Sequence, residues 1–89
     1  MSRWSLRVAP AAERTLGRLP DKVAVAVVEF ITGPLLDVPE RVGKPLQREL
    51  SGYRSARCGA YRIIYRLVQA EGSVRVLRIE HRATVYRAR

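Results

Sequence analysis

The sequence predicts a single α+β domain over residues 1–89, in which an N-terminal strand and a two-helix hairpin pack on an antiparallel sheet of about four strands. Apolar residues recur at helical spacing between residues 10 and 32, and at every second position in much of the chain after residue 53. A chain of 89 residues is long enough for one hydrophobic core and too short for two.

The first strand is predicted over residues 3–8, where the side chains alternate between two faces. Trp4, Leu6 and Val8 fall on one face, and polar side chains fall on the other. A period of two is typical of a strand that is buried on one side.

The two helices are bounded by proline and glycine. Pro10 suits the first turn of a helix over about residues 10–18, and Pro20 ends that helix. Asp21 begins a second helix, which Gly33-Pro34 closes. The second helix is rich in valine, a poor helix former, so packing must stabilise it.

Residues 34–52 are expected to form a loop, because three prolines and two glycines interrupt this segment. From Tyr53 the period returns to two. One face of the strand that follows is apolar and aromatic, with Tyr61, Ile63, Tyr65 and Leu67.

The last strand is predicted over residues 74–80, after a turn at Glu71-Gly72-Ser73. Its alternation slips at Val76-Leu77, which indicates either burial on both faces or a β-bulge. The helix pair is expected to cover one face of the three-strand run and to leave the other face open to a partner.

A hairpin rich in arginine is predicted around Gly59-Ala60, which fits a two-residue type II′ turn. This turn sets Arg57 directly opposite Arg62, and Arg66 follows on the same face. Like charges in directly opposed positions destabilise a sheet, and such a cost often marks a functional site. The alternative is a solvated edge whose charges prevent aggregation.

The charge is strongly positive and unevenly spread. The chain has seventeen basic and eight acidic residues, so its net charge is +9, and fifteen of the basic residues are arginine. Residues 46–89 carry +7 of this charge. The asymmetry points to a polyanionic partner, and arginine favours planar, bidentate phosphate contacts. A genome-wide bias towards arginine would explain part of the composition, but not the asymmetry.

Several functional classes do not fit the composition. One cysteine, Cys58, and one histidine, His81, leave no disulfide framework and no metal site rich in cysteine or histidine. The longest apolar run has six residues, far below the length of a membrane span. We expect no cofactor and no membrane association, and with no signal peptide in the sequence we expect a cytoplasmic location.

Ionisable side chains gather near the C-terminus, where His81, Arg82 and Tyr86 lie close together in the sequence. Histidine titrates near neutral pH, and a phenol surrounded by guanidinium groups is a better base than an isolated one. His81 could equally be an ordinary surface histidine, and Tyr86 could equally anchor the end of the chain.

Metal-free RNA cleavage fits this inventory of residues. The 2′-OH of RNA is an internal nucleophile beside the scissile phosphate, and arginines can stabilise the phosphorane that forms. The eight carboxylates are scattered, which does not suit a two-metal nuclease.

Three stretches of the sequence resemble the RelE/ParE toxin superfamily, and its RelE branch in particular. The first is Gly43-Lys44-Pro45-Leu46 with Glu49-Leu50-Ser51-Gly52. The second is the hairpin from Ser55 to Arg66, and the third is His81-Arg82 followed by Val85-Tyr86-Arg87. The resemblance covers nearly the whole chain.

The resemblance implies a microbial-RNase-like fold of the RelE type and a toxin of a type II toxin–antitoxin pair. Such toxins cleave mRNA, usually in the ribosomal A site, through the 2′-OH, and thereby inhibit translation and arrest growth. It also implies a cognate acidic RelB-like antitoxin that forms a hetero-oligomer with the toxin and blocks the cleft.

The resemblance also implies roles for residues at positions that match the motifs of the family. The catalytic residues implied are Arg57 on the hairpin, Arg62 on the scissile phosphate, Arg82 at the transition state or leaving group and Tyr86 near the 2′-OH, with His81 in support. Basic residues expected to bind mRNA or the ribosome are Lys44, Arg48, Arg54, Arg66 and Arg87.

The sequence departs from the family on the second strand of the chain, which leads into the Gly59-Ala60 turn. The best-known branch has two lysines there, one of them proposed as the base, whereas this chain reads Arg54-Ser55-Ala56-Arg57. Arginine stays protonated and is a poor base, so His81 or Tyr86 would take that role, or catalysis would be mainly electrostatic. Two alternatives stay open: a gyrase-inhibiting toxin like ParE without nuclease activity, and a non-catalytic RNA- or ribosome-binding module.

Overall fold

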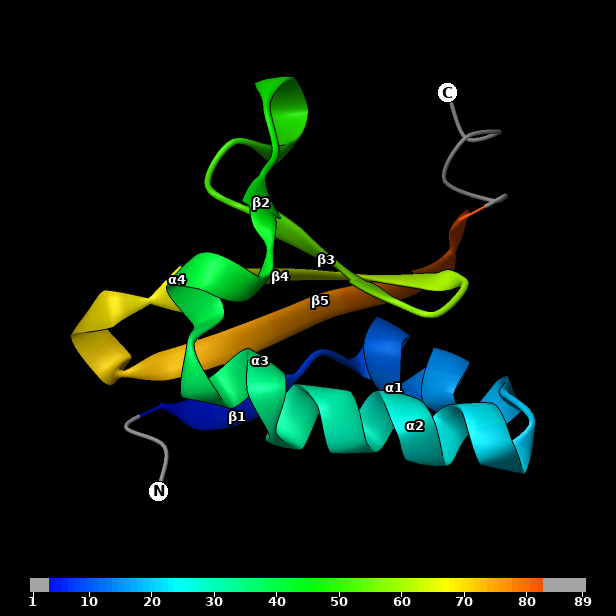
Figure 1. The fold of residues 1–89 in the computed structure, drawn as a ribbon. Coiled ribbons are helices and arrows are strands. Elements are labelled where there is room, and N and C mark those ends of the chain that lie inside the picture. The colour runs from blue at the N-terminus through cyan, green and yellow to red at the C-terminus, as the bar shows by residue number, and fades with distance from the viewer. Residues whose placement is uncertain (1–3, 83–89) are drawn as a thin grey trace.

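A computed structural model describes residues 4–82 as a twisted five-stranded sheet with helices against one face (Figure 1). The elements in chain order are β1 (Ser5–Val8), α1 (Pro10–Arg18), α2 (Asp21–Thr32), α3 (Pro34–Asp37), α4 (Pro39–Val42), β2 (Lys44–Pro45), the 3-10 turn η1 (Arg48–Leu50), β3 (Arg54–Cys58), β4 (Tyr61–Val68), the 3-10 turn η2 (Gln69–Glu71) and β5 (Ser73–His81). The strand order is β1-β5-β4-β3-β2. The α+β class and the pair of long helices are confirmed.

The expected antiparallel sheet of about four strands has five strands and is mixed, because β1 pairs with β5 in parallel orientation. Leu6 lies beside Val74 and Val8 beside Val76 in this register. The apolar side of β1 therefore joins the apolar side of β5, while α1 and α2 carry the chain back across the sheet. Pairing between residues this far apart has no signature in local periodicity.

The expected loop over residues 34–52 is also corrected in part. Pro34 and Pro39 each occupy the first turn of a four-residue helix instead of simply interrupting the chain. These two helices bury Leu35, Leu36 and Pro39. The segment ends in the two-residue strand β2, which forms the edge of the sheet beside β3.

The core lies between the helices and one face of the sheet. Ile63 and Tyr65 of β4 are fully buried and pack with Val27 and Ile31 of α2. Burying a large apolar side chain is worth about 1.5–3 kcal/mol. This packing explains why the valine-rich α2 is helical despite weak intrinsic propensity.

The arginine hairpin has the predicted register. Arg57 pairs with Arg62 and Cys58 with Tyr61. Gly59 has φ 60°, and Ala60 has no positive φ, which is the combination a type II′ turn requires. A side chain at Gly59 would strain this turn.

The predicted irregularity in β5 is a β-bulge. Ile64 of β4 pairs with Arg78, and Tyr65 pairs with Val76, so Leu77 is the extra residue. Because of this insertion, Val76 and Ile79 face the core although they are three positions apart.

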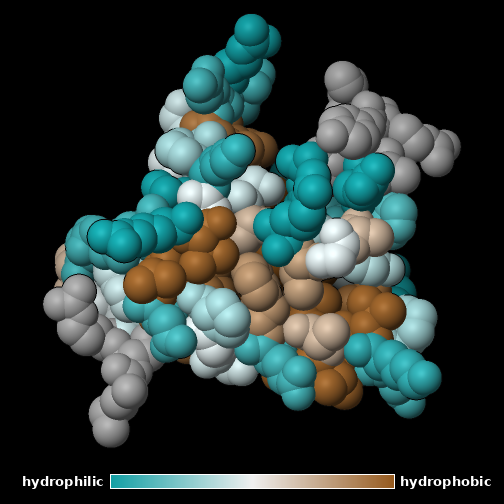
Figure 2. All heavy atoms as spheres, in the orientation of Figure 1, coloured by the Kyte–Doolittle hydropathy of each residue, from teal (hydrophilic) through white to brown (hydrophobic). Residues whose placement is uncertain are grey.

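Figure 2 shows how polarity is distributed over one side of the molecule. Apolar side chains run across the middle of this view, from the α3–α4 segment towards α2. Hydrophilic side chains gather above them, over the segment from β2 to β3 and over the β3–β4 hairpin. Among residues 4–82, no helix has the length and apolar character needed to cross a membrane.

Candidate active site

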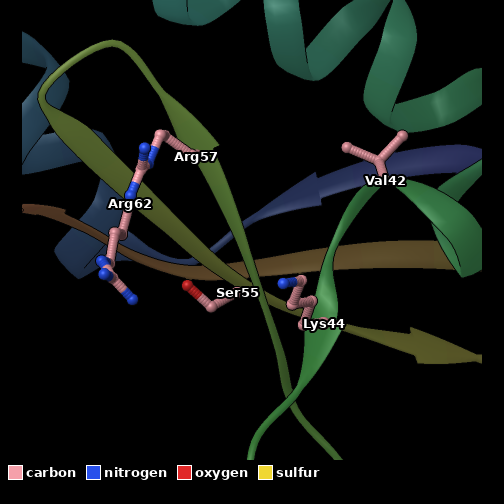
Figure 3. A pocket seen from close by; sticks show the side chains of 5 residues that line it. All are labelled: Val42, Lys44, Ser55, Arg57 and Arg62. Carbon is pink, nitrogen blue, oxygen red and sulfur yellow. The ribbon is translucent and has the colours of Figure 1, made fainter.

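A polar hollow of about 360 Å³ lies at the β2–β3–β4 end of the sheet (Figure 3). Its lining is dominated by cations and consists of Val42, Lys44, Ser55, Arg57 and Arg62. Three neighbouring strands and the end of α4 thus supply one site. The two arginines lie side by side in Figure 3, and the Lys44 side chain faces them from across Ser55.

Sheet register fixes these side chains on one face. Lys44 pairs with Ser55, and Arg57 pairs with Arg62. Directly opposed residues place their Cβ atoms about 5 Å apart, and residues two positions apart on a strand share a face. The hollow therefore combines one ammonium, one hydroxyl and two guanidinium groups opposite the helix-covered face.

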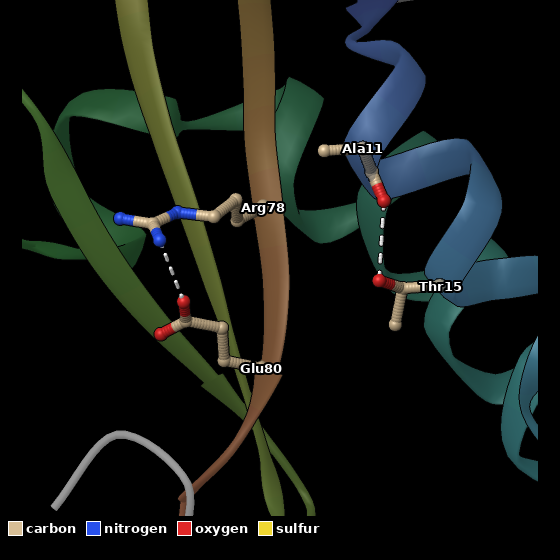
Figure 4. Close-up of polar contacts among 4 residues, drawn as sticks. All are labelled: Ala11, Thr15, Arg78 and Glu80. Atoms are coloured by element: carbon tan, nitrogen blue, oxygen red, sulfur yellow. Dashed lines mark hydrogen bonds and ion pairs between the residues drawn. The ribbon is translucent and has the colours of Figure 1, made fainter. Parts of the chain in front are cut away.

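The opposed arginines are unfavourable in the absence of an anion, since two like charges face each other across the hairpin. Glu80 pairs with Arg62 on the other side of β4, and it forms an ion pair with Arg78 at 3.2 Å (Figure 4). One carboxylate beside three arginines leaves a positive excess. An anion such as a phosphate would relieve the repulsion.

Backbone and side-chain contacts hold the α4–β2 segment against the sheet. The buried Tyr65 hydroxyl donates to the carbonyl of Pro39 at 2.8 Å. The Arg54 Nη2 donates to the carbonyls of Glu40 at 2.6 Å and Gly43 at 2.8 Å. These bonds fix the backbone that leads directly into Lys44. Burial raises the pKa of Tyr65, so the phenol stays neutral and remains a donor.

Arg54, which the sequence predicts to bind RNA, does not line the hollow. It lies on the same face as Ala56, turned towards the core side of the sheet, where it satisfies the two carbonyls of the α4–β2 segment. In this position the Arg54 side chain holds the α4–β2 segment against the sheet. The alternation of β3 puts Arg54 and Arg57 on opposite faces, because they are three positions apart.

Arg66 lies on the open face but does not line the hollow. Its guanidinium stands 5.8 Å from the ring centroid of Tyr53, a cation–π arrangement. Its Nε is buried and has no hydrogen-bond partner within residues 4–82. Arg48 lies in η1, between β2 and β3, where it has φ 62° and an exposed side chain.

His81 is not brought to the hollow. It pairs with Tyr61, and the two rings meet edge to face at 5.2 Å with an interplanar angle of 87°. Tyr61 belongs to the helix-covered face, so His81 faces the same way. Both line a separate hollow of about 510 Å³ beside α1, where Thr15 hydrogen-bonds the Ala11 carbonyl at 3.1 Å (Figure 4).

Arg82 lies at the end of β5, and its backbone N–H donates to the Ala60 carbonyl at 2.8 Å. This bond ties the end of the last strand to the hairpin turn. Arg82 is thereby anchored near the hairpin, but it does not line the hollow. Tyr86 and Arg87 lie outside the residues that the structure describes.

Ser55, Val42 and Tyr65 were not among the site residues predicted from the sequence. Ser55 could have been found from its position two residues before Arg57 on the same face. Val42 and Tyr65 could not, since they take part only through the fold of the α4–β2 segment. Lys44 was assigned to RNA binding, and its place beside the arginine pair depends on the pairing of β2 with β3.

The chemistry available in the hollow is that of anion binding and charge stabilisation. The polar side chains that line it within residues 4–82 are cationic or neutral, with no carboxylate or imidazole among them to bind a metal ion. No group of three His, Cys, Asp or Glu residues that could hold a metal occurs in the described part of the chain.

The fold and the hollow together define a class: small, basic α+β proteins with a cationic pocket on the open face of the sheet. The family described as ParE toxin of the type II toxin–antitoxin system parDE matches residues 6–86. Two toxins of Mycobacterium tuberculosis are similar over 84 residues, or 94% of this chain. Toxin RelG is 48% identical with 97% of its length covered, and Toxin RelE is 43% identical with 87% covered.

A solved structure is similar as well. The RelBE2 toxin–antitoxin complex of Mycobacterium tuberculosis contains a chain with a TM-score of 0.84 and 47% identity, with 89% of this chain and 98% of that chain covered. This protein belongs to the RelE/ParE superfamily of toxins from type II toxin–antitoxin systems. The family resemblance in the sequence is thereby confirmed.

Proposed function

We propose that this toxin is a metal-independent endoribonuclease that cleaves mRNA in the ribosomal A site and thereby stops translation. The observation that carries the proposal is the hollow shared by Lys44, Arg57 and Arg62. Three cations on one face of a rigid sheet can surround a single phosphate. The similarity to toxins named RelG and RelE supports the RelE branch.

The proposed reaction is attack of the 2′-oxygen on the adjacent phosphorus. The O2′–P bond forms and the P–O5′ bond breaks, which leaves a 2′,3′-cyclic phosphate and a 5′-hydroxyl. Arg57 and Arg62 would bind the non-bridging oxygens, where negative charge develops in the transition state. Preorganised donors of this kind often supply the largest single contribution to catalysis. Arg82 and Tyr86 stay proposed contributors from the end of the chain.

The donor set supports the proposed metal independence. A divalent cation would meet ammonium and guanidinium groups in the hollow, which repel it, and no carboxylate among the described lining residues would bind it. The cations of the protein would instead neutralise the phosphorane directly. We expect cleavage to be unchanged by chelators of transition-metal ions at a Mg²⁺ concentration that keeps the ribosomes intact.

The first test is Arg62→Ala. We expect this variant to fold, and to lose cleavage by about 10²–10³-fold, because one donor to the phosphorane is gone. The measurement is mapping of transcript 5′ ends after induced expression, with circular dichroism as the check on folding. Arg18→Ala is the matched control, since Arg18 is exposed on α1 at the helix-covered face. Growth arrest and transcript cuts at the normal level in folded Arg62→Ala would overturn the assignment.

The second candidate is gyrase inhibition, and the match to a family described by ParE favours it. A supercoiling assay run beside primer extension on translated mRNA separates the two functions. Fresh mRNA ends with unaffected gyrase support the nuclease. Inhibited gyrase with intact mRNA would establish the ParE-like function. If neither effect were observed, the remaining candidate would be an RNA-binding module without chemistry.

We further propose that an acidic RelB-like antitoxin binds this toxin and covers the face with Arg57 and Arg62. The similar RelBE2 structure is a toxin–antitoxin complex, and a chain of +9 attracts an acidic segment over a long range. A flexible acidic segment can order on binding and cover a wide surface. Co-expression with the partner should remove toxicity.

A further inference from the structure

We infer that Lys44 is the general acid that protonates the 5′-oxygen leaving group. The inference rests on the proposed nuclease function and deepens it. The sequence gives no lysine on β3 or β4, and the structure brings one from a different strand. Lys44 is the first residue of β2, a strand of only two residues at the edge of the sheet.

The position of Lys44 is set by register. It lies directly across from Ser55, so both side chains stand on the open face with Arg57 and Arg62. In Figure 3 the ammonium end of Lys44 points towards Ser55 and the arginine pair, into the hollow. A phosphate held by the arginines would therefore have Lys44 on its far side.

The backbone around Lys44 is held by three neighbours. A Cβ on Gly43 would overlap the Tyr65 hydroxyl and come within 3.0 Å of the Ser55 carbonyl oxygen, so β2 packs closely on the sheet there. Arg54 binds the Gly43 carbonyl at 2.8 Å. This packing restricts the backbone that carries the amine, as a group that transfers a proton requires.

Among the described side chains that line the hollow, Lys44 is the one suited to giving up a proton. A guanidinium keeps its proton in proteins, so Arg57 and Arg62 can bind charge but not transfer a proton. The hydroxyl of Ser55 is a weak acid. An alkylammonium is a much stronger acid than a sugar hydroxyl, so transfer to the departing 5′-alkoxide is downhill. His81 stands on the other face of the sheet.

The step balances as a transesterification. A solvent hydroxide ion takes the 2′-OH proton, the O2′–P bond forms, and the P–O5′ bond breaks as an Nζ proton of Lys44 moves to O5′. The neutral amine then takes a proton from water and regenerates hydroxide. The products are a 2′,3′-cyclic phosphate and a 5′-hydroxyl, with no net consumption of water.

The test uses two RNAs that differ at one atom. The ordinary RNA has oxygen at the scissile 5′ position, and the second has sulfur there, which is a good leaving group without protonation. Both are presented on programmed ribosomes to wild type, Lys44→Ala, Lys44→Arg and Lys22→Ala. Lys22 is the matched control, because it is the only other lysine and is exposed on α2.

At toxin concentrations that saturate binding, we expect both Lys44 variants to cut the ordinary RNA about 100-fold or more slowly than wild type. The sulfur-containing RNA should be cut at nearly the wild-type rate. Lys22→Ala should cut both at the wild-type rate. An equal loss on both RNAs, or full activity of Lys44→Arg on ordinary RNA, would show that Lys44 only binds charge and would overturn the inference. Wild type that cuts neither RNA would overturn the nuclease function itself, and the inference with it.

Discussion

The geometry of the hollow depends on Gly43, because this residue has no side chain. The Tyr65 ring and hydroxyl occupy the space that a side chain at Gly43 would need. Tyr65 cannot move aside easily, because it is fully buried and its hydroxyl is bonded to Pro39. The edge strand therefore approaches β3 closely only with glycine before Lys44.

Replacement of Gly43 by alanine should test this close packing. We expect Gly43→Ala to lower the free energy of unfolding by about 1–3 kcal/mol, the usual range for overpacking. It should also slow cleavage, because β2 and Lys44 must shift together. The measurements are urea denaturation and the cleavage assay.

Gly17→Ala is the matched control, since nothing lies within 4 Å of a Cβ at that exposed helical position. Alanine is favoured over glycine in a helix by about 0.5–1 kcal/mol, so this control should be slightly stabilised. If Gly43→Ala were as stable and active as Gly17→Ala, the close approach of β2 would not constrain the site.

At the scale of elements, the α4–β2 segment depends on bonds to side chains from the sheet. Tyr65 reaches from β4 to Pro39, and Arg54 reaches from β3 to Glu40 and Gly43. The segment has little regular structure of its own, with a helix of four residues and a strand of two. Its position is therefore set by the sheet beneath it.

Tyr65→Phe should loosen this segment without emptying the core. The buried Pro39 carbonyl would lose its donor, and we expect a loss of about 1–3 kcal/mol in unfolding free energy. Amide hydrogen exchange should rise in residues 39–45 more than in β4 or β5. Unchanged protection across residues 39–45 would contradict the role of the hydroxyl.

The same substitution gives a pH signature. Burial raises the folded-state pKa of Tyr65 above the ordinary tyrosine value of about 10. The stability that this shift contributes is complete below pH 10 and falls as the pH rises through the folded-state value. Wild type should lose stability above about pH 10 more steeply than Tyr65→Phe.

At the scale of the whole molecule, positive charge is concentrated where the fold leaves a sheet face uncovered. The chain carries +9, and the helices cover the opposite face. Three of the cations, Lys44, Arg57 and Arg62, gather at one hollow. The affinity for RNA should therefore fall strongly as the salt concentration rises, because binding releases counterions from the RNA.

Salt titration measures this dependence. For single-stranded RNA each neutralised phosphate contributes about −0.7 to the slope of log K against log salt. One phosphate in the hollow therefore predicts a slope of about −0.7, and contacts of other basic residues with neighbouring phosphates make it steeper. The ligand is a 2′-O-methyl RNA, which cannot react. Lys44→Ala should weaken binding and make the slope less steep, and Lys22→Ala should change both by less. A slope near zero for wild type would contradict electrostatic binding at the hollow.

Local sequence patterns predicted much of the sheet. Gly59-Ala60 set the turn, and the period of two set Arg57 opposite Arg62, as the structure confirms. The broken alternation at Val76-Leu77 predicted either burial on both faces or a β-bulge, and the structure has the bulge. These features depend on neighbours within a few residues, which is the range over which periodicity and turn chemistry are informative.

Long-range pairing decided the rest. The sequence by itself determined the fold class, the hairpin register and the excess of arginine, because these depend on chain-local geometry and composition. Only the tertiary structure placed β1 parallel to β5, set Lys44 across from Ser55 and turned His81 towards the helices. Each of these depends on which distant strands bury their apolar faces together, a choice made by packing of the whole core.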